Sequence, residues 1–164
     1  MLDRDDGHVY GLDISSYMHK VASKRLRPFI RAKRATLLIS DVEFMPFLES
    51  SFDVCFHINS FYFWADLDYA LRQVYRVLKP GGRVACAFSP KLLRRFKELG
   101  YLAYARYDPL TYSMALEASG FSHLEWRQWR DRTPNDEPAD SVPHYIPFDT
   151  ITASKPYLKM LSDQ

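Results

Sequence analysis

A change in hydrophobic period marks residues 52–89 as a strand–helix–strand unit. Residues 54–58 form a short apolar run without clean alternation, which predicts a strand buried on both faces. Between Leu67 and Leu78 the apolar positions recur at helical spacing, with charged side chains on the opposite side. A second apolar run follows at 84–88. Because two buried strands joined by one helix lie parallel with a right-handed crossover, the pattern predicts an α/β fold.

Local start and stop signals delimit the helix of this unit. Asp66 stands at the N-cap position, where a carboxylate accepts a backbone hydrogen bond from the first turn. Pro80 presets the first dihedral of a type II turn, and Gly81 can adopt the positive φ that the next position requires. The helix is therefore expected to end at residues 79–82.

Similar patterns predict the remaining elements. Strands are expected at 9–12, 36–39, 124–129 and 148–153, and helices after Ser15 or Ser16, at 91–100 and at 110–118. Pro28 should kink or restart the first helix, and a short turn is expected at Met45-Pro46. Residues 133–147 hold four prolines and several acids and predict a long excursion, and a short helix is expected after Pro156.

The bulk composition describes one domain of balanced charge. The 164 residues carry a net charge of +2, so nothing favours nucleic acid or an acidic lipid surface as a partner. The most basic stretch, residues 20–34, is interpreted as a solvated helix face, with a patch for RNA or phosphate as the alternative. No apolar run is long enough for a membrane span, and the polar N-terminus does not resemble a signal peptide. Cys55 and Cys86 fall inside predicted buried strands, which favours reduced packing residues of a cytoplasmic protein over a disulfide.

Polar residues end three of the predicted strands, namely Asp13, Asp41 and Asn59. If these strands are parallel neighbours, the three side chains line the edge at which α/β sheets bind ligands. Asp13 is suited to accept both ribose hydroxyls of a nucleoside, and Asp41 could accept from an exocyclic amine such as that of adenine. Each acid taken singly is also a common N-cap or turn former. It is the pair at corresponding strand ends that favours a nucleoside pocket.

Successive motifs resemble those of class I S-adenosylmethionine-dependent methyltransferases. The matching segments are VYGLDIS at 9–15, DVE at 41–43 with PF at 46–47, SFDV at 51–54, RVLKPGGR at 76–83, ASGF at 118–121 and TASKP at 152–156. The resemblance is closest to the small-molecule branch that includes the ubiquinone/menaquinone type, and it covers nearly the whole chain in the right order. It implies a single domain over 1–164 with a Rossmann-like, mostly parallel sheet and an antiparallel final strand.

The resemblance also implies roles for particular residues. Asp13 would hold the ribose of S-adenosyl-L-methionine, and Ile14 would pack on the adenine. Asp41 and the backbone of Val42 would hydrogen-bond the adenine edge, and Asn59 would lie near the sulfonium end. A small-molecule acceptor is implied, and nothing in the sequence names it.

The family begins with a central strand and a glycine-rich loop, and this sequence shows neither. Its first strand corresponds to the family's second, Gly7 and Gly11 are the only glycines before Gly81, and no G-x-G occurs. The interpretation is a fold truncated at its N-terminus, either a shortened product or a degenerate relative. Because a missing central strand leaves the ladder groups of its neighbours unpaired, we expect low stability or a protein partner that fills this position.

Aromatic side chains follow the strand that ends at Asn59. One of the rings at residues 61–64 could face a sulfonium through a cation–π contact, but a lid or core role is favoured. His57 is interpreted as a packed histidine rather than a base. The loop after the next strand carries Tyr101, Tyr104 and Tyr107, where an acceptor could bind.

Two other functional classes fit parts of the pattern. A catalytically silent methyltransferase-like scaffold, acting by protein interaction, would keep the same fold. A nicotinamide-nucleotide domain would also place an acid after its second strand, but the absence of G-x-G-x-x-G counts against it. The turn around Asp41, the segment at 79–82 and the returning last strand favour S-adenosylmethionine-dependent methyl transfer.

Overall fold

The computed structural model describes residues 7–103, 105–129 and 147–157. The chain forms two units, Met1–Pro46 and Phe47–Gln164, and each has its own β-sheet. The predicted helix after Pro156, and all but the last residue of the predicted excursion at 133–147, lie outside the described residues.

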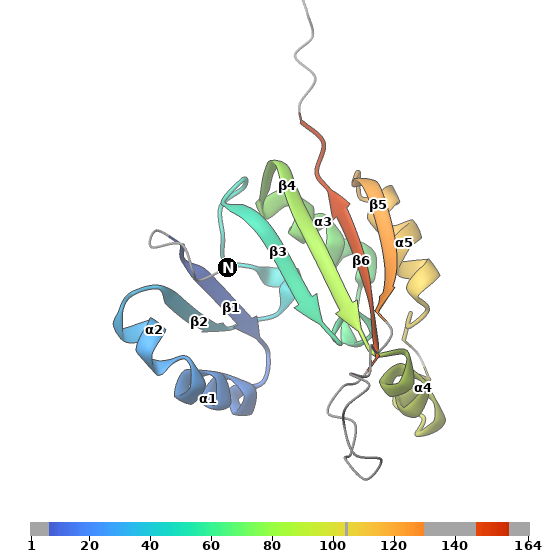
Figure 1. The fold of residues 1–164 in the computed structure, drawn as a ribbon, viewed down its shortest axis with the longest axis horizontal. Helices are drawn as coiled ribbons and strands as arrows, with labels where there is room; N and C mark the ends of the chain where they lie inside the picture. The colour runs from blue at the N-terminus through green and yellow to red at the C-terminus, as the bar shows by residue number, and fades with distance from the viewer. Residues whose placement is uncertain (1–6, 104, 130–146, 158–164) are drawn as a thin grey trace, which may run out of the picture. The chain divides into compact units, whose positions relative to one another are not determined.

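The first unit is a strand–helix–strand crossover (Figure 1). β1 (Val9–Asp13) pairs in parallel with β2 (Ala35–Ile39), so that Asp13 lies opposite Ile39. The connection consists of α1 (Ser16–Arg25), which Ser15 caps, and α2 (Arg27–Arg31), where the helix restarts at Pro28 as predicted. A 3-10 turn, η1 (Val42–Phe44), follows β2 in place of the turn predicted at Met45-Pro46.

The second unit contains a four-stranded sheet in the order β3-β4-β6-β5. Its elements are β3 (Phe52–Ile58), the 3-10 turn η2 (Phe61–Phe63), α3 (Leu67–Val77), β4 (Leu78–Phe88), α4 (Pro90–Glu98), α5 (Pro109–Ala118), β5 (Ser122–Trp129) and β6 (Phe148–Ser154). β3 and β4 are parallel, whereas β6 runs antiparallel to both of its neighbours. The predicted α/β fold with parallel crossovers and an antiparallel final strand is confirmed.

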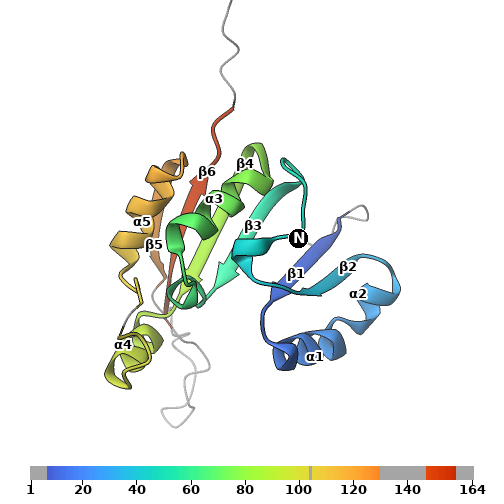
Figure 2. The same cartoon turned by 180° about the vertical axis from the view of Figure 1, so that it is seen from behind.

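The core of the second unit lies between its sheet and the helices α3 and α5, which cover one face of the sheet (Figure 2). Alternate residues of β4, namely Val84, Cys86 and Phe88, point into this core. Tyr112 and Leu116 enter it from α5. The apolar positions predicted for this helix, the last of which is the C-cap residue of α3, are all buried: Leu67, Ala70, Leu71, Val74 and Leu78. The periodicity of the sequence therefore predicts the buried face of α3 correctly.

The sequence prediction that β3 is buried on both faces is wrong. Cys55 and His57 are partly buried, whereas Val54, Phe56 and Ile58 are 37%, 55% and 61% exposed. Within its sheet β3 is an edge strand that pairs with β4 alone. The helices α3 and α5 pack on the face that carries His57, which leaves the apolar side chains of the opposite face uncovered by them.

The strands that end at Asp13, Asp41 and Asn59 do not form one sheet, contrary to prediction. β1 and β2 form a two-stranded sheet, and β3 belongs to the four-stranded one. Each parallel pair is joined by a helical crossover, which such pairing requires. The connection between β2 and β3 carries only the short turn η1. The parallel pairs are therefore β1 with β2 and β3 with β4, because a helical crossover joins the two strands of each pair.

Lys155 ties the end of β6 to the end of α3. Its ammonium donates hydrogen bonds to the carbonyl oxygens of Tyr75 at 2.8 Å and Leu78 at 2.7 Å, and it lies 4.5 Å from the centre of the Tyr75 ring. Carbonyls at a helix C-terminus have no partner within the helix, so a cation there satisfies them. Nearby, Gly81 adopts the predicted positive φ of 78°, and its N–H donates to the Lys155 carbonyl at 2.9 Å.

We predict that Lys155→Ala lowers the free energy of unfolding by about 1–3 kcal/mol, because two carbonyls lose a charged donor. The midpoint of thermal unfolding, followed by circular dichroism, should fall by several degrees. Lys79→Ala is the matched control, since Lys79 forms an exposed ion pair with Asp53 at 2.8 Å, and such pairs contribute little. Equal midpoints for the two variants would contradict this role of Lys155.

Candidate functional site

Asp13 lies at the carboxyl end of β1, at the turn into α1. Its Oδ1 accepts a hydrogen bond from the Ser15 N–H at 2.8 Å, and the Ser15 hydroxyl in turn accepts from the Met18 N–H at 3.2 Å. Asp13 is exposed, and no hydrogen bond to its Oδ2 is found among the described residues. Asp13 therefore shapes the turn with one carboxylate oxygen, and its other oxygen stays available.

Asp41 has the same arrangement at the end of β2. Its Oδ1 accepts from the Glu43 N–H at 3.0 Å and so caps η1. The Ser40 N–H donates to the Asp13 carbonyl at 3.2 Å, which continues the β1–β2 ladder up to the two acids. The first unit therefore brings the two predicted carboxylates to the same end of adjacent parallel strands. Two such carboxylates can accept from hydroxyl and amine donors together.

Two further residues singled out in the first unit follow these acids directly. Ile14 is 71% exposed, so its side chain is free to cover an apolar ligand face. Val42 is the first residue of η1, and its main chain is part of the turn that Asp41 caps.

Asn59 belongs to the second unit and joins the carboxyl ends of β3 and β4. Its N–H donates to the Ala87 carbonyl at 2.8 Å, and its side-chain oxygen accepts from the Ser89 N–H at 2.9 Å. Its φ of 51° lies in the left-handed region, which asparagine tolerates better than most residues. Ser89 then caps α4 by accepting from Leu92 N–H at 3.3 Å.

Two positions before Asn59, the imidazole ring of His57 has a hydrogen-bond partner at each of its two nitrogens. Its Nε2 lies 2.8 Å from the Tyr112 hydroxyl and its Nδ1 lies 3.0 Å from the Ser60 hydroxyl. The imidazole also packs on the ring of Trp64, with centroids 4.6 Å apart. Burial of the ring lowers the pKa of His57 to about 3, so it is neutral at ordinary pH. The structure supports the interpretation of His57 as a packed histidine.

The two cysteines are free thiols, as the sequence predicts. Burial raises the pKa of Cys55 to about 11, and it raises the pKa of Cys86 by more. Since the thiolate is the nucleophile, neither cysteine is suited to covalent catalysis.

A cavity of about 880 Å³ opens beside Asn59 at the carboxyl ends of β3 and β4. Its walls are largely apolar and include Ile58, Ala87, Phe88 and Leu92. This is the edge at which ligands bind in α/β sheets. Its volume falls in the range of small-molecule and cofactor sites.

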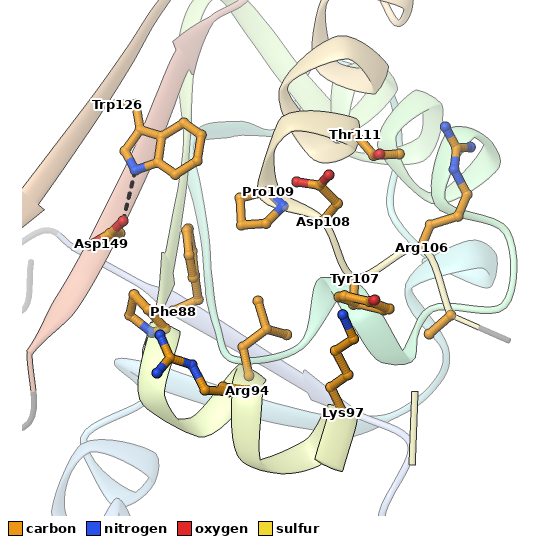
Figure 3. A pocket seen from close by; sticks show the side chains of 13 residues that line it. Phe88, Arg94, Lys97, Arg106, Tyr107, Asp108, Pro109, Thr111, Trp126 and Asp149 are labelled. Carbon is orange, nitrogen blue, oxygen red and sulfur yellow. Dashed lines mark hydrogen bonds between the residues drawn. The ribbon is translucent and has the colours of Figure 1, made fainter. Parts of the chain in front are cut away.

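A second cavity, of about 650 Å³, lies between α4, the segment leading into α5, and the strands β5 and β6 (Figure 3). On its left in Figure 3, the Trp126 indole N–H donates to Asp149 Oδ2 at 3.0 Å. Phe88 and Arg94 line both cavities, so the two are adjacent.

Residues 1–86, just over half of the chain, match the family described as "Methyltransferase domain". The chain belongs to this methyltransferase family. It is 35% identical over 92 residues to "Uncharacterized methyltransferase YdaC" of Bacillus subtilis, which covers 56% of this chain and 49% of that protein. It is 33% identical over 99 residues to a demethylmenaquinone methyltransferase of Symbiobacterium thermophilum, and this match covers 60% of this chain and 39% of that protein. The chain thus spans half or less of these curated relatives.

A solved structure supports the fold of this methyltransferase domain. The chain superposes on a SAM-dependent methyltransferase of Thermotoga maritima with a TM-score of 0.64 and 21% identity, covering 89% of this chain and 72% of that one. The family match and the likeness to the demethylmenaquinone methyltransferase confirm the predicted resemblance to class I methyltransferases of the ubiquinone/menaquinone type. The superposition confirms the Rossmann-like fold. None of the helices in the described ranges is long and apolar enough to cross a membrane.

Sequence reasoning singled out some residues around these cavities and missed others. Phe61 and Tyr62 are core residues, each 1% exposed, in agreement with the favoured core role, whereas Phe63 is 56% exposed. Tyr107 lines the smaller cavity as suggested for the tyrosine loop, whereas Tyr104 lies outside the described residues. Trp126 and Asp149 could not be found from the sequence, because they are 23 positions apart and meet only through antiparallel pairing.

We predict that His57 makes stability depend on pH between about 6.5 and 3. In that window the unfolded chain binds a proton at His57 and the folded chain does not, so stability falls as the pH falls. This single group contributes a slope of up to about 1.4 kcal/mol per pH unit. Urea unfolding at a series of pH values should show a shallower loss of stability for His57→Gln, which keeps hydrogen-bonding groups but does not titrate. Parallel slopes for the two proteins would contradict the lowered pKa.

Proposed function

We propose that this methyltransferase domain acts in S-adenosyl-L-methionine-dependent methyl transfer to a small-molecule acceptor. The observation that carries the proposal is the pair Asp13 and Asp41, at the same end of adjacent parallel strands, each with one carboxylate oxygen still available. A nucleoside needs acceptors for its ribose hydroxyls and its exocyclic amine, and this pair supplies them. The residues present therefore fit the nucleoside part of the cofactor.

Each candidate residue then has one task. Asp13 would accept from the ribose hydroxyls, Ile14 would cover the adenine face, and Asp41 with the backbone of Val42 would bind the adenine edge. Asn59 belongs to the second unit, and its side-chain oxygen is used by Ser89, so its structural part is to fix the rim of the larger cavity.

The bound cofactor would supply a methyl group on a positively charged sulfur, which is a very good leaving group. The protein's main tasks are then to align the acceptor for in-line attack and to keep water away. A dedicated base is not required for every acceptor. This fits a site where His57 is held neutral by its packing and both cysteines stay protonated. The two adjacent cavities have the size of small-molecule sites.

We predict that Asp13→Asn and Asp41→Asn each weaken binding of S-adenosylhomocysteine by about 10- to 100-fold. Asparagine can still cap the following turn through its side-chain oxygen, but it removes the charge from a hydrogen bond of about 1.5–3 kcal/mol. Isothermal titration calorimetry of each purified variant measures the effect.

The matched control is Asp53→Asn, which removes an exposed carboxylate that, among the described residues, pairs with Lys79 alone. It should bind S-adenosylhomocysteine as the parent chain does. If Asp13→Asn and Asp41→Asn also retain the parent affinity, the two acids do not form the nucleoside site.

We also propose a protein partner, in the form of a further β-strand that pairs with the open edge of β3. Within the described residues β3 pairs with β4 only, and its exposed side chains Val54, Phe56 and Ile58 are all apolar. Unprotected edges of this kind are templates for strand addition. An apolar strand from another polypeptide would satisfy the edge and cover these side chains.

We predict that hydrogen exchange alternates along β3 in the chain alone. Because the Asn59 N–H bonds to β4, the N–H groups of Cys55 and His57 also face β4, whereas those of Phe56 and Ile58 face the open edge. In amide exchange measured by NMR, Phe56 and Ile58 should exchange much faster than Cys55 and His57. Equal protection of all four amides would show that the edge is already paired.

A further inference from the structure

The smaller cavity combines apolar walls with positive charge. Phe88, Leu93, Pro109 and Trp126 supply apolar surface around it, as Figure 3 shows for the three that it labels. α4 contributes Arg94 and Lys97 to the same cavity, and the segment before α5 contributes Arg106.

Within the described residues, the acids that line this cavity form no ion pair with its cations. Asp108 caps α5 by accepting from the Leu110 N–H at 2.9 Å, and the buried Asp149 accepts from Trp126. Arg106 pairs with Asp68 at 2.6 Å, and its guanidinium points away from Arg94 and Lys97 in Figure 3.

Arg94 and Lys97 are the cations that stay available. Among the residues that the structure describes, neither forms an ion pair. The Lys97 ammonium lies 5.3 Å from the centre of the Tyr107 ring, which holds it against the wall of the cavity. The two residues stand three positions apart on α4, but their charged groups point to different parts of the cavity: in Figure 3 the Lys97 ammonium points toward Tyr107, and the Arg94 guanidinium extends toward Phe88.

The geometry points to a binding site for a small acceptor with a flat apolar body and an anionic group, the anion lying against Lys97. That this ligand is the methyl acceptor rests on the proposed function. It is supported by Phe88 and Arg94, which line both this cavity and the larger one that carries Asn59. The apolar walls would bind the body of the molecule, and Lys97 would orient it through the anionic group.

The test compares two probes of the same shape that differ in charge, 2-naphthoate and 2-naphthylmethanol. Binding to the whole chain is followed by isothermal titration calorimetry. We expect 2-naphthoate to bind about tenfold more tightly, in line with charge-assisted contacts at a solvent-accessible site. Equal dissociation constants for the two probes would overturn the inference.

Matched variants on α4 locate the anion. Lys97 lines only the smaller cavity, and Arg95 lines only the larger one, so Lys97→Gln and Arg95→Gln remove the same charge from different places. We expect Lys97→Gln to weaken 2-naphthoate binding about tenfold without affecting 2-naphthylmethanol, and Arg95→Gln to leave both unchanged. Equal losses in the two variants would overturn the assignment, because a general charge effect would explain them.

The same titrations separate this inference from the proposed function. S-adenosylhomocysteine is titrated into the parent chain and into Lys97→Gln, where its affinity should be equal. Charge-selective naphthoate binding in a chain that does not bind S-adenosylhomocysteine would uphold the anion site and overturn its role as an acceptor site. Cofactor binding without charge-selective naphthoate binding would overturn the anion site and uphold the proposed function.

Discussion

Parallel pairing through a helical crossover is the constraint on which the rest of this structure depends. Parallel strands end on the same side, so each crossover places the residues that follow its two strands next to each other. In the first unit this brings Asp13 and Asp41 to corresponding ends. In the second it brings Asn59 to the start of α4, where its side chain accepts from Ser89. The candidate residues for methyl transfer are thus placed by topology.

The polar residues at these strand ends combine structural and binding roles. Asp13 and Asp41 each use one oxygen to organise the following turn, which fixes the carboxylate and leaves its second oxygen available. The interpretation of these acids as turn formers and their interpretation as ligand-binding groups are therefore compatible. His57 shows the opposite case, since Tyr112 and Ser60 occupy both ring nitrogens and burial keeps the ring neutral.

Features with a local cause could be predicted from the sequence, and features set by distant contacts could not. Asp66 caps α3 and Gly81 adopts a positive φ, because these depend on a few neighbouring residues. The exposure of Phe56 depends on which strands and helices pack against β3, and the apolar run alone does not reveal that. The smaller cavity joins α4, the start of α5 and two antiparallel strands, so its charge arrangement follows only from the fold.

The most direct test of the account is thermal unfolding of this 164-residue chain with and without excess S-adenosylhomocysteine, followed by circular dichroism. A ligand present at about 100 times its dissociation constant adds about 2.7 kcal/mol of stability. For a domain of this size, that raises the midpoint by several degrees. The account predicts a cooperative transition with such a shift. An unchanged midpoint at saturating S-adenosylhomocysteine would contradict the claim that this chain holds a working cofactor site.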